Sequence, residues 1–495
     1  MNDRTRHELT RDQLAQDDVA WMDATAQAEL VRTGEVTPTE LVEAALERIN
    51  ALNPALNAVI HDLSDKARAA AADPALADGP FRGVPFLLKD VVAHSAGDPY
   101  HCGMQVLKDA AWVEPADTWL VERFRAAGFV ICGKTNLPEL ASSVTTEPRA
   151  YGATHNPWDL DRSPGGSSGG AGAAVASGMV PVAHGNDMGG SIRFPASTCG
   201  LVGLKPTRAR STLGPDFGEY WAMTTHEHVL TRTVRDTAGV LDAIAGPGVG
   251  DPYSAPTPSR PFLDEVGADP GRLRVGYRTA ISGSQSESHP DCVAAVAATA
   301  TLLAALGHTV EAVELEALDD PRFAAGVGTA FPVFIARELE RWSQRLGRPI
   351  AATELEPWNQ MMAEVGGATS AAAYVEALEQ LQGYARDVAT WWAGGFDILL
   401  TPTLTRPPVP LGFVGPEVDP MEAFTRLAGL TSFSMPFNVT GQPAISLPMH
   451  WNAEGLPIGV QLVAAYGRED LLLRVASQLE VAQPWAQRRP PVSVA

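Results

Sequence analysis

Short apolar runs and amphipathic stretches alternate along most of the chain. Three compact apolar runs, at residues 129–132, 273–277 and 396–401, have the length and composition of buried strands. Residues 292–306 instead form a longer, alanine-rich stretch that Gly307 ends, which predicts a helix. Because strands and helices follow one another in turn, the pattern predicts an α/β fold with helices layered on one large sheet.

The same patterns place further elements. Further strands are expected at residues 179–184, 309–313, 444–448 and 458–463, and further helices at residues 118–127, 169–177 and 471–479. Thr37 and Glu40 form a capping box around Pro38, so a helix should begin at Pro38 and run to about residue 51. The proline- and glycine-rich segment 246–261 is predicted to be a surface excursion, because the alternation of strands and helices continues beyond it.

Composition limits the class of protein and its partners. With 45% hydrophobic and 19% charged residues among 495, the chain has an ordinary globular balance. Its formal net charge of −21 disfavours nucleic acid and anionic membranes as partners, since both would repel it. No stretch approaches about 18 uninterrupted apolar residues, so no membrane-spanning helix is expected.

The N-terminus and the cysteines indicate the compartment. Residues 1–18 are rich in charge and lack the apolar core of a signal peptide, so we expect a mobile segment there and one domain over residues 19–495. The four cysteines are widely spaced with no Cys-x-x-Cys pair, and Cys132 and Cys199 have apolar or small-residue surroundings. Buried, reduced thiols are therefore expected, and a cytoplasmic location fits them best.

Two serines and one lysine are the candidate catalytic groups. Ser167 and Ser191 lie 24 residues apart in a stretch unusually rich in glycine and serine, which lets a substrate approach the backbone closely. Lys89 ends the apolar run 83–88, and on a strand its side chain would point inward while Asp90 would point to the opposite face. The chain has only five lysines against 32 arginines, and only a lysine readily loses its proton when buried. Two hydroxyls and a buried amine form a proton-passing chain that needs no histidine.

These residues and their neighbouring motifs resemble the amidase signature family of serine hydrolases. The likeness runs from about residue 83 to residue 206 and includes the motifs at 133–136, 165–170, 191–197 and 203–206. It implies that Ser191 is the nucleophile, Ser167 the bridging serine and Lys89 the base. It also implies a single compact domain whose large mixed sheet is covered by helices on both faces, with no cofactor.

The resemblance extends to the backbone around the two serines. The N–H groups of residues Met188, Gly189, Gly190 and Ser191 would form the oxyanion hole, and the peptide bond that enters Ser167 would be cis. Met188 is a departure, because the family often has threonine or serine at this position. The departure makes the expected pocket wall beside the nucleophile more apolar.

Segments outside the signature are similar to those members of the family that hydrolyse nylon oligomers. They lie at residues 23–30, 181–187, 441–448 and 459–470. This likeness implies a linear or cyclic aliphatic amide as substrate, such as a 6-aminohexanoate oligomer. Hydrolysis of carbamates (urethanes) and aryl acylamidase activity stay open as alternatives on the same three residues.

A glutamine-hydrolysing subunit of a transamidation complex is a further alternative, and it would need a small polar pocket and a partner protein. Residues 323–335 are instead almost wholly apolar, and we expect them, with Phe331, to line the substrate pocket. Ser142 is a second candidate substrate contact, through a hydrogen bond to the carbonyl or amide. We expect a small-molecule amide or carbamate as the partner, and leave open whether the protein forms a homodimer.

Three other motifs match known patterns without the structural context that those patterns need. Residues 128–135 match the phosphate-loop pattern, but the residues between its glycines look like a strand. Residues 165–169 match the nucleophile elbow of α/β-hydrolases, but no apolar strand precedes them. The sequence His226-Glu227-His228 has no third ligand nearby and is predicted to be a solvated loop, so no metal site is expected.

Overall fold

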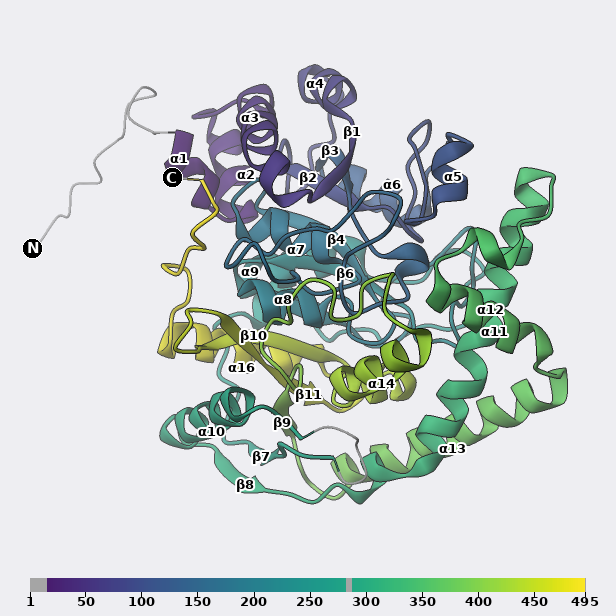
Figure 1. Cartoon of the computed structure of the whole chain (residues 1–495). Coiled ribbons are helices and arrows are strands. Elements are labelled where there is room, and N and C mark those ends of the chain that lie inside the picture. Colours follow the sequence, from purple (N-terminus) through teal and green to yellow (C-terminus); the bar gives the residue numbers. More distant parts are fainter. Residues whose placement is uncertain (1–15, 282–286, 495) are drawn as a thin grey trace, which may run out of the picture.

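The computed structural model describes residues 16–281 and 287–494. In these residues eleven strands form one mixed sheet, in the order β1-β3-β2-β4-β6-β5-β10-β11-β9-β7-β8, and helices cover both of its faces (Figure 1). The predicted α/β class and the single large sheet are confirmed. Of the predicted N-terminal segment 1–18, residues 1–15 lie outside the described residues, and helix α1 begins at Gln16.

The strands are β1 Val59–Asp62, β2 Pro85–Lys89, β3 Val130–Thr135, β4 Val182–Asp187, β5 Val202–Lys205, β6 His226–Thr231, β7 Arg274–Tyr277, β8 Thr309–Ala312, β9 Ile398–Pro402, β10 Ala444–Trp451 and β11 Pro457–Ala464. The helices are α1 Gln16–Trp21, α2 Ala24–Thr33, α3 Pro38–Leu56, α4 Ser64–Ala72, α5 Gln105–Asp109, α6 Trp119–Ala126, α7 Gly169–Ala176, α8 Arg193–Cys199, α9 Val234–Ile244, α10 Pro290–Ala305, α11 Pro321–Leu346, α12 Pro357–Ala368, α13 Ala371–Ala393, α14 Pro420–Thr431, α15 Met435–Thr440 and α16 Glu469–Ala482.

Strand β2 lies between β3 and β4 and runs parallel to both. Leu87 packs into the core cluster that contains α3 and α7, whereas Phe86 and Leu88 pack into the cluster of α6 and α9 on the other face. Lys89 follows Leu87 by two residues, so its side chain leaves the strand end on the α7 side. This confirms the predicted inward direction of Lys89.

The C-terminal strands are covered on one face by α9, α10 and α16. Their side chains form one large core cluster with alternate residues of β10, such as Ile445 and Leu447. Further along the chain, α11 and α13 run side by side along one edge of the molecule, and α12 packs against α11 (Figure 1). Side chains of α11 and α12 belong to the same apolar cluster as Met188.

Most predicted elements are present, with shifted ends. The capping box at Thr37 and Glu40 is confirmed, but α3 continues to Leu56 and carries Pro54 in its last turns. The strand expected at 179–184 begins only at Val182 and continues to Asp187. Segment 246–261 has the exposed, irregular character expected of a surface excursion. All four cysteines are buried and free, as expected.

The prediction of a solvated loop at residues 226–228 is wrong. These residues begin β6, and their side chains are at most 3% exposed. Strand β6 is central because it pairs with both β4 and β5. Three consecutive polar residues favour a loop, whereas here all three pair with β4 in the interior of the sheet.

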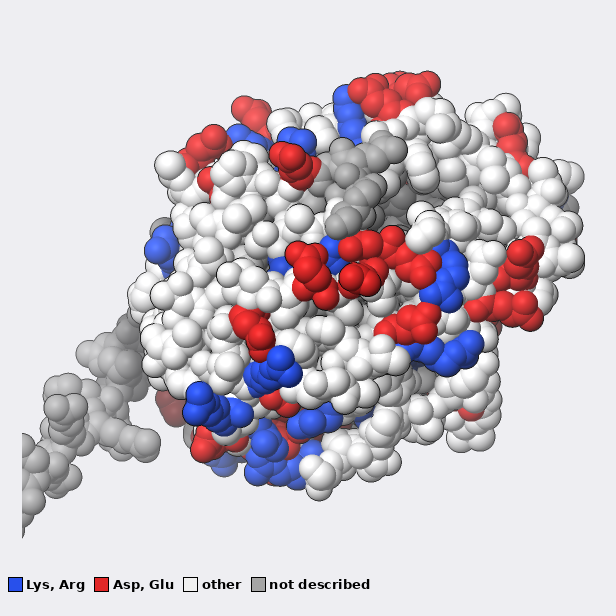
Figure 2. All heavy atoms as spheres, turned by 90° about the horizontal axis from the view of Figure 1, so that it is seen from below, with Lys and Arg blue, Asp and Glu red and all other residues white. Residues whose placement is uncertain are grey.

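The surface carries charge of both signs. Figure 2 shows a row of acidic side chains across the middle of one face, with basic side chains beside and below it. This agrees with the excess of acidic residues in the sequence. Among the described residues, no helix is both long and apolar enough to cross a bilayer.

Candidate active site

Lys89 ends β2 in a fully buried position beside the loop that leads into α7. Its Nζ donates hydrogen bonds to Ser167 Oγ at 2.7 Å, to Ser168 Oγ at 2.9 Å and to Asn186 Oδ1 at 2.6 Å. All three acceptors are uncharged, so no carboxylate contacts the amine. Burial lowers the pKa of Lys89 to about 7, although the charges of Glu227 and Asp187 act in the opposite direction. A large fraction of the amine is therefore neutral at pH 7.

The loop that carries Ser167 is held against a neighbouring segment by close backbone packing. The Gly166–Ser167 peptide bond is cis, as the sequence resemblance implies. A Cβ atom at Gly166 would lie 2.6 Å from the carbonyl oxygen of Thr145, so only glycine fits there. Ser167 itself is 1% exposed, and α7 begins two residues later at Gly169.

Ser191 lies on the loop between β4 and α8, which a buried ion pair closes. Arg193 donates from Nε and Nη2 to the two carboxylate oxygens of Asp187, both at 2.9 Å. The pKa of the Asp187 carboxyl is held well below its usual range, because the attraction of Arg193 outweighs the effect of burial. This bidentate pair fixes the two ends of the loop that carries the serine.

The C-terminal third of the chain secures the same loop. Arg193 Nη1 donates to the backbone oxygen of Ser434 at 2.9 Å, and Ser434 Oγ donates to the backbone oxygen of Gly189 at 2.6 Å. Asn438 Nδ2 donates to Asp187 Oδ1 at 2.9 Å. Residues about 240 positions apart in the sequence thus determine the shape of the loop.

The backbone of this loop exposes a row of donors. Asp187 Oδ2 accepts the N–H of Ile192, whereas the N–H groups of residues 188–191 have no protein acceptor within the described chain. Gly190 has φ +143°, and a Cβ atom there would lie 2.2 Å from the Phe194 ring. The loop therefore requires glycine at this position, and its free N–H groups lie beside Ser191.

The two candidate pocket residues differ in their surroundings. Phe331 packs edge-to-face on Trp221, with 4.4 Å between ring centroids, and both belong to the apolar cluster that contains Met188. Ser142 Oγ instead donates to Asn359 Oδ1 at 2.6 Å and to the backbone oxygen of Glu139 at 3.0 Å. The Ser142 hydroxyl proton is thus engaged within the protein.

Sequence reasoning gave no role to several polar residues that surround the candidate triad. Arg193 lies in the motif at residues 191–197 and Asp187 ends the segment 181–187, so opposite charges six residues apart across a glycine turn were the available signal. Asn186 contacts Lys89 directly, and its only signal was its place one residue before Asp187. Ser434 and Asn438 had no local signal, because only the tertiary fold brings them to the loop.

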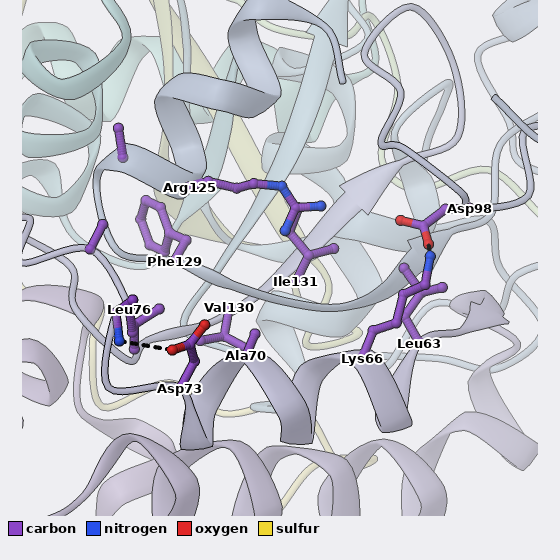
Figure 3. Close-up of a pocket in the computed structure, with 13 residues that line it drawn as sticks. Leu63, Lys66, Ala70, Asp73, Leu76, Asp98, Arg125, Phe129, Val130 and Ile131 are labelled. Carbon is purple, nitrogen blue, oxygen red and sulfur yellow. Dashed lines mark hydrogen bonds and ion pairs between the residues drawn. The ribbon is translucent and has the colours of Figure 1, made fainter. Parts of the chain in front are cut away.

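A cavity of about 340 Å³ lies elsewhere, between α4 and the segment from α6 to β3 (Figure 3). Two of its charged side chains are paired: Lys66 with Asp98, which also lines the cavity, and Arg125 with Asp117, which does not, at 2.9 Å. None of the sequence-predicted site residues lines it. Among the described residues, no group of three or more His, Cys, Asp or Glu side chains has an arrangement that could hold a metal ion.

Comparison with known proteins shows the family of the chain. Residues 40–473, most of the chain, match the profile of the family described as Amidase. The chain belongs to the amidase family. As a member it is an amidase, an enzyme that hydrolyses amide C–N bonds. The predicted family and enzyme class are therefore confirmed.

Individual relatives cover nearly the whole chain. The 6-aminohexanoate-cyclic-dimer hydrolase of Paenarthrobacter ureafaciens is 47% identical over 478 residues, which are 95% of this chain and 96% of that protein. A solved structure of 6-aminohexanoate cyclic dimer hydrolase superimposes with a TM-score of 0.90 at 46% identity, and covers 96% of this chain and 99% of its own. A bacterial aryl acylamidase structure follows with a TM-score of 0.84 at 26% identity, over 95% and 98% of the two chains.

Proposed function

We propose that this amidase hydrolyses apolar aliphatic amides, including linear or cyclic 6-aminohexanoate oligomers, through an acyl-enzyme on Ser191. The observation that carries the proposal is the buried Lys89 amine, whose three acceptors are all uncharged and include Ser167. Relatives named for the cyclic dimer of 6-aminohexanoate, at 47% identity over nearly the full chain, support the substrate class.

In the proposed mechanism, neutral Lys89 accepts a proton from Ser167, and Ser167 accepts one from Ser191. Ser191 Oγ attacks the amide carbonyl, and the carbonyl oxygen becomes an oxyanion. The N–H groups of residues 188–191 donate to this oxyanion, and the loss of one such donor typically costs about 3 kcal/mol. The relay then runs backwards to protonate the leaving amine, and water activated by the same relay releases the acid.

The wall beside Met188 supports an apolar substrate. Met188 belongs to one hydrophobic cluster with Leu140, Trp221 and Ile335, and Phe331 packs against it. A carboxylate or ammonium without a partner is costly to bury against such a wall near the scissile bond. Aryl acylamidase and carbamate activity use the same residues and the same wall, and the aryl acylamidase neighbour keeps the first of these as a second candidate.

A substrate panel tests the proposal. We expect kcat/KM for 6-aminohexanoate cyclic dimer, linear dimer or medium-chain anilides to exceed that for glutamine by at least about tenfold, which corresponds to about 1.4 kcal/mol. Ser191→Ala serves as the control and should lose turnover by about 10⁵-fold or more. A fluorophosphonate should add mass to the native protein at Ser191. Equal turnover of glutamine, or labelling of the same region in Ser191→Ala, would contradict the proposal.

A further inference from the structure

A buried histidine and a buried glutamate lie beneath the end of β2. The backbone N–H of Lys89 donates to His184 Nδ1 at 3.2 Å, and His184 Nε2 lies 2.5 Å from Glu227 Oε2. His184 is 0% exposed and Glu227 is 1% exposed. The chain of contacts joins the backbone of the candidate base to a carboxylate on β6, two strands away.

The direction of the first hydrogen bond fixes the state of the histidine. A backbone N–H can only donate, so Nδ1 must accept and carries no proton. The imidazole is then neutral with its proton on Nε2, which donates to Glu227. Glu227 Oε2 therefore accepts this N–H, and Glu227 Oε1 has no hydrogen-bond partner among the described residues.

The position of the pair explains how it acts on Lys89 without touching the amine. His184 follows Val182 by two residues, and Glu227 precedes Val229 by two. Residues two apart on a strand point to the same face, so both side chains start on the face that packs against α6 and α9. The Lys89 side chain leaves the strand toward α7. The hydrogen-bond partners of Lys89 Nζ are Ser167, Ser168 and Asn186, so Glu227 attracts a positive charge on Lys89 without a direct hydrogen bond to the amine.

The other titratable groups nearby do not supply a positive charge to balance Glu227. Burial lowers the pKa of His228 to about 3, and it lowers the pKa values of His226 and Lys205 well below their usual ranges. Asp187 also faces Lys89 from the end of β4, but Arg193 already balances its charge. Lys89 is the group in this region that gains a positive charge when it accepts a proton.

We infer that Glu227, oriented by His184, is a positioning residue that supplies the fixed counter-charge for the Lys89 ammonium formed during catalysis. This inference rests on the proposed function, in which Lys89 is the base. A buried carboxylate stabilises a nearby ammonium and so raises the pH at which that ammonium loses its proton. Electrostatic partners that are in place before the reaction also need no reorganisation when the charge appears.

The test is the pH dependence of labelling of the full-length protein by a fluorophosphonate, which requires no knowledge of the substrate. Wild-type protein should show a rise in the labelling rate through about pH 7, as Lys89 becomes neutral. Glu227→Gln should move this limb to lower pH, by on the order of one unit. The sign follows because the amide no longer stabilises the ammonium. Glu227→Asp keeps the charge and should leave the limb close to its wild-type position.

Asp236→Asn is the matched control, since Asp236 is another fully buried carboxylate. It lies on α9 and accepts from the N–H groups of Ala24 and Thr25, with no contact to His184. Its limb should stay in place. If the labelling rate of wild-type protein does not rise through about pH 7, or if Lys89→Met keeps that rise, the proposed function fails. If that limb exists and folded Glu227→Gln leaves it unmoved, only the present inference is overturned.

A second measurement is made on wild-type protein, and a variant is needed only to assign the signals. In ¹⁵N NMR spectra of histidine-labelled protein at pH 7, His184 should show an unprotonated Nδ1 and a protonated Nε2. The signals are assigned by their loss in His184→Gln. An imidazolium, or a proton on Nδ1, would remove the hydrogen bond on which the counter-charge depends and would overturn the inference.

Discussion

Lys89 and Lys134 lie on adjacent strands and are both fully buried, but opposite kinds of group surround them. Lys89 Nζ contacts two serine hydroxyls and an asparagine oxygen. Lys134 Nζ contacts Asp90 Oδ1 at 3.0 Å and the backbone oxygen of Pro99 at 2.7 Å. Burial alone therefore does not make a lysine a base. Uncharged acceptors leave the amine free to lose its proton, whereas a carboxylate keeps the ammonium in place.

Asp90 shows the other side of this difference. It is fully buried, and burial by itself would raise its pKa, but Lys134 and His61 lower that pKa to about 2. His61 Nε2 lies 3.1 Å from Asp90 Oδ2, and the backbone N–H of His101 donates to the same oxygen at 2.8 Å. The Lys134 site is thus a closed ion pair that binds β3 to the loop after β2, and its role is structural.

The largest expected effect comes from removing the first of the two amines. Lys89→Met should lower kcat/KM by about 10²–10⁴-fold, because a positioned base contributes an acceleration of this size. It should also remove the limb of the pH–rate profile that rises through about pH 7. Lys66→Met, at an exposed lysine, is the control. A variant that keeps the wild-type limb would break the distinction between the two buried lysines.

The second prediction concerns stability and the other amine. Lys134→Met should destabilise the fold by about 3–5 kcal/mol, because it leaves the Asp90 carboxylate buried without its cation. Urea denaturation at pH 7 measures this free energy of unfolding. Asp90→Asn in the same protein should recover part of the loss. Unchanged stability of Lys134→Met would show that the ion pair is not the structural element described here.

The smallest expected effect is the pH dependence of the folding free energy that is lost by burying Lys89. Its pKa is 10.5 in the unfolded chain and about 7 in the fold, so between these values the unfolded state binds more protons. The penalty for burying Lys89 is complete below about pH 7 and disappears as the pH rises toward 10.5. The free energy of unfolding of Lys89→Met, measured relative to wild type, should therefore be higher at pH 7 than at pH 10. The expected difference is roughly 2–4 kcal/mol.

Urea denaturation of both proteins at pH 7 and pH 10 checks this sign. A relative gain that is equal at the two pH values, or larger at pH 10, would mean that Lys89 keeps its ordinary pKa in the fold. That result would also remove the reason to treat Lys89 and Lys134 as different.

The sequence by itself determined how the chain is layered and named the candidate catalytic residues. The glycine and serine spacing selected Ser167 and Ser191, and the apolar run before Lys89 predicted a strand with that lysine pointing inward. Strand and helix periodicity predicted the α/β class, because burial on one face leaves a local record in the sequence. The capping box at Thr37 placed the start of α3 for the same reason, since all of its contacts are local.

Only the tertiary structure decided what surrounds those residues. Residues 226–228 were predicted to be exposed, yet they pair with β4 inside the sheet, and Glu227 thereby reaches His184 beneath Lys89. Ser434 and Asn438 close the Ser191 loop from about 240 residues away. The proton affinity of a buried group depends on the charge and hydrogen bonding of every neighbour. Those neighbours come from strands whose pairing no local pattern records.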